Sequence, residues 1–177
     1  NAHDETGLSR CVPRRLEAEP LLDTMTQVLD ASIRFGGHEP GTRAVQLVGV
    51  RNGEFRYARP EMGDDFLKLF GKPNRLQSCE CERSNETTLA QTFEMVGGEV
   101  VTRLVSGDDN IVATALNSDQ SATDFVTSLY WSALCRAPRE GELQSLCAHI
   151  DQSQERRGGL EDVVWAVLNS NEFLLRY

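Results

Sequence analysis

The stretch that decides the fold is SATDFVTSLYWSALCRAPREGELQSLCAHI, residues 121–150. Both of its halves place apolar residues three and four positions apart, so that each half has one apolar face if it is helical. A short turn, Arg136-Ala137-Pro138, separates them and makes the two helices antiparallel neighbours. The apolar residues are Ala122, Phe125, Val126, Leu129 and Ala133 in the first half, and Leu143, Leu146, Cys147 and Ile150 in the second.

A third helix is expected immediately after this pair. Val163, Val164, Val167 and Leu168 repeat at helical spacing after Gly158-Gly159. The segment Asn169-Ser170-Asn171-Glu172-Phe173 then closes this helix and opens a last turn. We therefore predict a three-helix bundle over residues 119–177.

Further helices are predicted upstream. One extends from about Arg14 to Phe35 and ends at Gly36-Gly37; because of Pro20, it either begins at that proline or kinks there. A short helix from Asp64 to Phe70 is capped by its two aspartates. From Thr87 a helix buries a face that consists of Leu89, Phe93 and Val96, and Gly97-Gly98 ends it. Shorter helices follow over Glu99 to Ser106 and Ile111 to Leu116, the latter capped by Asp108-Asp109-Asn110.

A small β element interrupts this helical pattern. Ala44 to Val50 has the composition of a strand, and Asn52-Gly53 is a strong turn signal before Glu54 to Tyr57, so a β-hairpin is expected near residues 44–58. The predicted fold class is mainly α. We expect residues 1–13 to be a loose lead-in and residues 14–118 to be a helical region on which the bundle of residues 119–177 packs.

Composition excludes several classes of protein. The formal net charge of −9 and the scattered arginines argue against nucleic acid as a partner. No apolar run approaches the roughly 20 residues that span a bilayer, so no membrane span is expected. The chain begins without an initiator Met or an export signal, which favours an internal or processed piece of a longer protein.

The most distinctive chemistry lies in Cys79-Glu80-Cys81-Glu82-Arg83. We weigh three interpretations: a disulfide staple, with Cys11 as a further candidate partner, a buried free thiol, and a metal or redox role. The metal signal is weak because a zinc site needs four ligands in recognisable pairs, whereas this chain has one close cysteine pair and isolated histidines. We therefore predict no metal site, and the staple is the favoured interpretation.

The remaining reactive residues give no active-site pattern. Cys135 and Cys147 are expected to be small core residues, about 10 Å apart along the helical hairpin and therefore unbridged. His3, His38 and His149 are isolated, and no nucleophile, phosphate-loop or zinc-protease motif occurs. No Cys-x-x-Cys-His is present, so no haem attachment and no cofactor is expected in this chain. We predict no catalytic residue.

Four ordered segments together resemble a known family. They are Arg14-Arg15-Leu16-Glu17-Ala18-Glu19; the Cys79 to Ser84 stretch with Thr88-Leu89-Ala90-Gln91; Leu129-Tyr130 with Arg136, Pro138 and Glu142; and Leu168 to Phe173. From about Arg14 to Phe173 the chain resembles the carboxy-terminal planctomycete-type domain of unknown function 1553. Its last third is also similar to a helical module of secreted and surface-layer-associated bacterial proteins.

This resemblance implies a setting and supplies no reaction. It implies the last part of a large exported protein, an extracytoplasmic location, and upstream domains that include a cytochrome-c-like one. We favour a non-catalytic structural or protein-interaction module, whose partners are the remaining domains or other protein chains, with assembly into an oligomer as a further option. The alternative is part of a redox or hydrolytic enzyme whose site the upstream domains complete.

Overall fold

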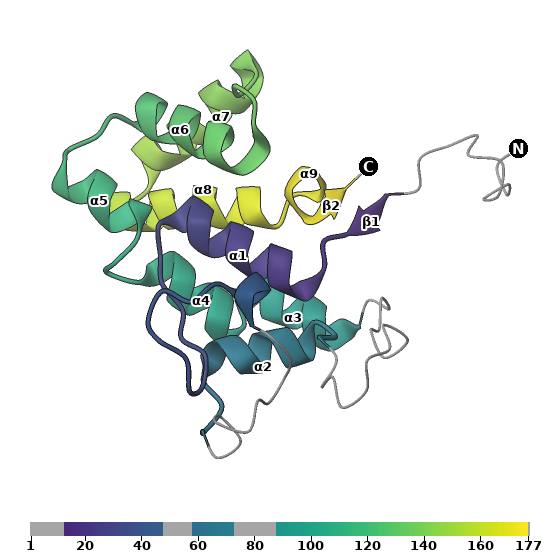
Figure 1. Cartoon of the computed structure of the whole chain (residues 1–177). Helices are drawn as coiled ribbons and strands as arrows, with labels where there is room; N and C mark the ends of the chain where they lie inside the picture. Colours follow the sequence, from purple (N-terminus) through teal and green to yellow (C-terminus); the bar gives the residue numbers. More distant parts are fainter. Residues whose placement is uncertain (1–12, 48–57, 73–87, 177) are drawn as a thin grey trace, which may run out of the picture.

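The computed structural model describes residues 13–47, 58–72 and 88–176, and its architecture is mainly α, as predicted. Figure 1 shows helices packed in layers around α1, with the two short strands beside the ends of the described chain. The elements are β1 (Arg14–Arg15), α1 (Ala18–Leu29), the 3-10 helix η1 (Ala44–Gln46), α2 (Met62–Leu69), α3 (Leu89–Gly97), α4 (Glu99–Ser106), α5 (Ile111–Asn117), α6 (Ala122–Leu134), α7 (Glu140–Gln152), α8 (Arg156–Leu168), α9 (Asn171–Leu174) and β2 (Leu175–Arg176).

The three helices predicted at the carboxy-terminal end are confirmed as α6, α7 and α8, and each packs against the other two. One detail of the prediction is wrong, because α8 begins at Arg156 and takes both Gly158 and Gly159 into its first turn. Gly159 lies where α8 meets the end of α7. A Cβ atom at Gly159 would lie only 3.0 Å from the Cα of Ile150, so this glycine permits a close approach of the two backbones.

Helix α1 is the central helix, and it contacts α2, α4 and α6 (Figure 1). It begins at Ala18 and ends at Leu29, earlier than the predicted stop at Gly36-Gly37, because Asp30 adopts a left-handed φ of 49° as its C-cap. Pro20 is the third helical residue and causes no break. The first main-chain bond of the helix joins Leu21 N–H to Glu17 O, so an N–H at position 20 would have no partner in the helix.

Helices α2 and α4 contact α1 on the side away from α6 (Figure 1), whereas α3 packs on α4 and α5 packs on α8. Helix α2 has Glu61 as its N-cap residue, and Asp64, one of the two predicted aspartates, caps the helix: its Oδ2 accepts from Glu61 N–H at 2.9 Å. Helix α5 is capped by Asn110, as predicted: its Oδ1 accepts from Ala113 N–H at 3.0 Å. Gly97 and Gly98 end α3, also as predicted.

The buried face of α3 is the main error of the sequence analysis. Leu89, Phe93 and Val96 were expected in the core, but they are 76%, 70% and 53% exposed. Gln91 and Met95 face the core instead. Gln91 is held there because its side-chain amide donates to Leu69 O at 2.9 Å and accepts from Arg15 Nη1 at 2.7 Å. A buried amide with both ends bonded has little desolvation cost, so polarity did not keep this residue at the surface.

The predicted strand at Ala44 is also wrong within the described residues, because Ala44–Gln46 is a turn of 3-10 helix. Asp23 explains the difference: its carboxylate accepts from the main-chain N–H groups of Ala44 at 2.6 Å and Val45 at 3.0 Å, which favours a turn over extended pairing. Residues 48–57, with the rest of the expected hairpin, lie outside the described residues. The sheet that the structure contains pairs β1 with β2 in antiparallel register, Arg15 opposite Leu175.

One hydrophobic core joins both ends of the chain. Its most deeply buried large side chains come from α1, α2, α4, α5, α6 and α8. They are Phe66, Phe125, Leu21, Leu22, Met25, Leu29, Leu67, Leu129, Leu160, Leu168, Val101 and Val112. Within the described ranges, no helix combines the length and the apolar character that crossing a membrane requires.

Candidate functional site

The cysteine element that the sequence singled out, Cys79-Glu80-Cys81-Glu82-Arg83, lies outside the described residues, and so does Cys11. The two cysteines that are described, Cys135 and Cys147, are free thiols. Cys147 is half-buried and packs against the core, with its Sγ 3.8 Å from Thr123 Oγ1. Cys135 is exposed and caps α6 with a φ of 54°, so its expected place in the core is wrong.

The described histidines do not gather with acidic residues into a cluster. His149 lies on the surface of α7, where its Nε2 is 2.9 Å from Asp162 Oδ2 on α8, and both side chains are at least half exposed. Among the residues that the structure describes, no group of three His, Cys, Asp or Glu side chains is arranged to hold a metal ion. Asp64 and Asn110 serve as helix caps, as the sequence analysis expected of their segments.

The residues of the third and fourth motif segments, by contrast, meet at one point, the Arg136 junction, which consists of Tyr130, Arg136, Glu142 and Glu172. The Arg136 guanidinium binds Glu142 through two bonds of 2.8 and 2.9 Å. It binds Glu172 through two more, of 2.6 and 2.8 Å. Its remaining N–H donates to Ala137 O at 3.0 Å, so all five guanidinium donors have acceptors. The guanidinium also lies over the Tyr130 ring, 5.2 Å from the centroid.

Each member of the junction comes from a different part of the bundle. Tyr130 belongs to α6, Arg136 follows its C-cap, Glu142 lies in the first turn of α7, and Glu172 lies in the first turn of α9. Carboxylates in a first turn are stabilised by the positive end of the helix dipole. The junction therefore connects three helices through a single side chain whose hydrogen-bonding capacity is fully used.

Electrostatics at the junction favour its ionised form. Hydrogen bonds from Arg136, and then from the Arg139 N–H at 2.7 Å, lower the pKa of Glu142 to about 2. Hydrogen bonding to Arg136 also lowers the pKa of Glu172. The same bonds raise the pKa of Arg136, first through Glu172 and then through Glu142. A carboxylate held so firmly ionised is a poor proton donor or acceptor near neutral pH, so the junction is suited to joining helices.

A second arginine junction was missed by the sequence analysis. Arg157, in the first turn of α8, donates through Nη2 to Ser106 O at 2.9 Å and Gly107 O at 3.1 Å, which end α4. The same nitrogen contacts Asp108 at 3.0 Å, and Nε donates to Glu161 at 2.8 Å. The pair Arg157 and Glu161, four residues apart, was the only local signal of this contact. Its long-range partners are about fifty positions away and leave no periodic trace in the sequence.

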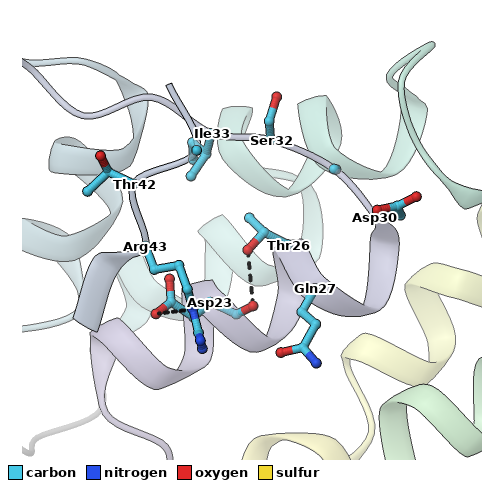
Figure 2. A pocket seen from close by; sticks show the side chains of 10 residues that line it. Asp23, Thr26, Gln27, Asp30, Ser32, Ile33, Thr42 and Arg43 are labelled. Atoms are coloured by element: carbon cyan, nitrogen blue, oxygen red, sulfur yellow. Dashed lines mark hydrogen bonds and ion pairs between the residues drawn. The ribbon is translucent and has the colours of Figure 1, made fainter. Parts of the chain in front are cut away.

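A groove of about 420 Å³ with a mixed polar and apolar lining lies between α1 and the segment that follows it. Figure 2 shows that Asp23, Thr26 and Gln27 line it from α1, and that Thr42 and Arg43 line it from the other side. The buried Asp23 carboxylate already accepts two main-chain N–H groups and lies 3.6 Å from Arg43 Nε. Thr26 Oγ1 donates to Asp23 O at 3.0 Å. These polar atoms fix the segment to α1, and they leave no convergent set of free groups in the groove.

Comparison with known proteins identifies a family. Neither the curated proteins nor the solved structures include a match to this chain. The family model described as PSD1, protein of unknown function (DUF1553), matches residues 1–150. That range covers α1 to α6 and all but the last two residues of α7, and it includes Tyr130, Arg136 and Glu142 of the junction but not Glu172. The chain belongs to the PSD1 (DUF1553) family, whose function is unknown.

Proposed function

We propose that the chain is a non-catalytic structural or protein-interaction module of a large exported bacterial protein. The single observation that carries this proposal is the Arg136 junction. Arg136, Glu142 and Glu172, the charged residues of the carboxy-terminal motif, bind one another between helices. Every N–H donor of the Arg136 guanidinium has an acceptor. A catalytic carboxylate needs a pKa near the working pH and access to substrate, whereas Glu142 is held at about 2 and bound on both oxygens.

The second support is the distribution of polar groups elsewhere in the described residues. Arg157 joins α8 to the end of α4, and Asp23 joins α1 to η1. These buried or half-buried polar residues have partners that a structural role explains. The exposed apolar residues of α3 are consistent with an interaction surface. Large exposed apolar patches on a protein commonly mark the sites at which it contacts another protein.

The setting of the module is part of the proposal. By family resemblance we place it in a planctomycete-type protein outside the cytoplasm, where it packs on the remaining domains or on other chains. The resemblance of its last third to modules of secreted and surface-layer-associated proteins suits the same setting. No cofactor or metal is required, and the module acts by presenting surfaces that the arginine junctions hold in place.

Two measurements on the full-length gene product test this proposal. The first is elemental analysis with disulfide mapping by mass spectrometry: the proposal expects no stoichiometric metal and a disulfide at Cys79 or Cys81. A bound metal that is lost in a Cys79→Ser/Cys81→Ser variant would contradict it and favour the enzyme alternative. The second compares Glu142→Gln with wild type by thermal unfolding. The variant is expected to unfold at a lower temperature than wild type. An unchanged unfolding temperature would contradict a structural role for the junction.

A further inference from the structure

The segment that follows α1, residues 31–35, has the burial pattern of a β-strand but belongs to no sheet. Ala31, Ile33 and Phe35 are partly or fully buried. Ser32 and Arg34, which lie between them, are exposed. A period of two indicates an extended chain with one covered face. Among the described residues the one sheet pairs β1 with β2, so residues 31–35 have no strand beside them in the described part of the chain.

The main chain of this segment is anchored to the helices on both sides of it. Ala31 N–H donates to Thr26 O of α1 at 3.0 Å, and Arg34 O accepts from Gly63 N–H of α2 at 3.2 Å. In an extended chain, the N–H and C=O groups of alternate residues point to the same edge. Ile33 therefore shares the edge of Ala31, which faces α1, and the groove of Figure 2 lies between this segment and α1.

Main-chain groups along the α1 edge are left without partners. The carbonyl of Ala31 and both main-chain groups of Ile33 make no hydrogen bond with any described residue. These donors and acceptors lie in a row along the chain and do not converge on a point. Such a row matches the backbone of a second extended chain, because an unpaired strand edge is a template for pairing. The volume of the groove, about 420 Å³, is within the usual range for ligand sites.

Opposite charges stand at the two ends of the groove. Figure 2 shows Arg43 beside Asp23 at one end and Asp30 at the other. The Asp30 carboxylate is exposed and pairs with no described residue, and the Arg43 side chain is 59% exposed although its Nε lies 3.6 Å from Asp23. Along α1, Asp23 and Asp30 are about 10 Å apart at 1.5 Å per residue. An extended chain covers that distance in about three residues.

We propose that this groove binds an extended peptide segment of a partner protein, which adds as an antiparallel strand to residues 31–35. Antiparallel pairing is the commoner and slightly more stable arrangement. Residues 31–33 run from the Asp30 end toward the Arg43 end (Figure 2), so the peptide has its amino-terminal side at Arg43. Charge complementarity then requires an acidic residue before, and a basic residue after, a core of about three residues. This inference rests on the proposed interaction role and names the site and the kind of partner.

Titration of the isotope-labelled full chain, followed by nuclear magnetic resonance, tests the inference. The probe is the peptide acetyl-Glu-Thr-Val-Thr-Lys-amide, and the reversed sequence, acetyl-Lys-Thr-Val-Thr-Glu-amide, is a control of the same composition. The probe should cause saturable shifts at the amides of Ser32, Ile33 and Thr42, with a Kd on the order of 1 mM because the contact is so short. The reversed peptide should bind about threefold more weakly, because its charges oppose those of the groove.

Two substitutions remove the charges at the ends of the groove. Asp30→Asn and Arg43→Gln should each weaken binding of the probe by about two- to fivefold. Asparagine tolerates the left-handed φ of 49° at position 30, so the end of α1 is kept. Asp119→Asn is the matched control, because Asp119 is also exposed, has a φ of 51° and does not line the groove. This variant should bind the probe as wild type does.

Methylation of single peptide nitrogens tests the main-chain pairing. In a strand that pairs along one edge, alternate N–H groups face the partner. Methylating the Val nitrogen and methylating either Thr nitrogen should therefore give Kd values that differ by at least about threefold, because only one of these positions loses a hydrogen bond.

Four results would overturn the inference. They are shifts at Ile33 that do not saturate below about 10 mM probe, equal binding of the reversed peptide, equal binding of all the methylated peptides, and wild-type binding by Asp30→Asn and Arg43→Gln. Absence of peptide binding leaves the proposed function standing, since metal content and the Glu142→Gln unfolding temperature test that proposal independently.

Discussion

The close approach of α7 and α8 at Gly159 gives a quantitative prediction. An alanine Cβ there would lie 2.7 Å from Ser153 Oγ and 3.0 Å from Ile150 Cα. Ser153 Oγ is not free to move away without loss, because it donates to His149 O at 2.7 Å. Gly158, one residue earlier in the same first turn, has open space at the corresponding position. Both glycines therefore lie in the same turn of α8, but only Gly159 has neighbouring atoms in the space that a side chain would occupy.

The magnitudes follow from two opposed effects. Replacing a helical glycine by alanine stabilises by about 0.5–1 kcal/mol through the unfolded chain and helix propensity. Overpacking at a close contact costs about 1–3 kcal/mol. Gly158→Ala should therefore raise the free energy of unfolding by about 0.5–1 kcal/mol, and the two variants should differ by about 1–3 kcal/mol, with Gly159→Ala the less stable.

Urea unfolding followed by circular dichroism measures both variants. In a chain of this length the predicted difference corresponds to roughly 2–12 °C in unfolding temperature. Because helix propensity contributes almost equally to both, the difference reports the packing of α8 on α7. Equal stabilities of Gly158→Ala and Gly159→Ala would refute the close contact on which the arrangement of these helices depends.

Three further predictions concern caps and charges. Asn110→Ala removes the α5 cap and leaves two α4 carbonyls without the donor that the Asn110 amide supplies. The free energy of unfolding, measured in urea, should therefore fall by about 2–4 kcal/mol. Ser121→Ala removes an exposed cap and should lower it by only about 1 kcal/mol. Cys135→Gly should stabilise by about 0.5–1 kcal/mol by relieving the left-handed φ of 54°, whereas Cys135→Ala should not, and equal unfolding temperatures for these two variants would contradict the strain. Because the pKa of Glu142 is lowered in the folded chain, its stabilising contribution is complete above about pH 4.5 and is lost as the pH falls toward about 2. The unfolding temperature of Glu142→Gln should therefore fall less steeply with acid than that of wild type. An identical pH dependence in the two proteins would rule out this linkage.

The sequence was informative where local periodicity and local caps decide the structure. The apolar faces of α6, α7 and α8 were predicted because residues three and four apart carry that signal within one helix. Asn110 was predicted as a cap because capping also acts within one turn. Helix types and approximate limits followed from these short-range effects.

The errors arose where a distant partner decides the outcome. The periodicity of α3 correctly indicated a helix, but it could not tell that Gln91 is buried through Arg15, 76 positions away, and that Phe93 therefore faces outward. The strand expected at Ala44 was replaced by a 3-10 turn because of Asp23, 21 positions earlier. Likewise, the motif identified Arg136 and Glu172 as distinctive residues, but only the fold shows that they bind each other across 36 positions.

The central claim is that the distinctive charges of the carboxy-terminal motif act by joining helices. Hydrogen exchange of Arg136→Gln against wild type tests it most directly, with Arg103→Gln as a control that loses one exposed ion pair. We predict faster exchange confined to the end of α6, the first turn of α7 and α9, with α3 and α4 unchanged. Exchange that is unaltered at those three elements would contradict the claim.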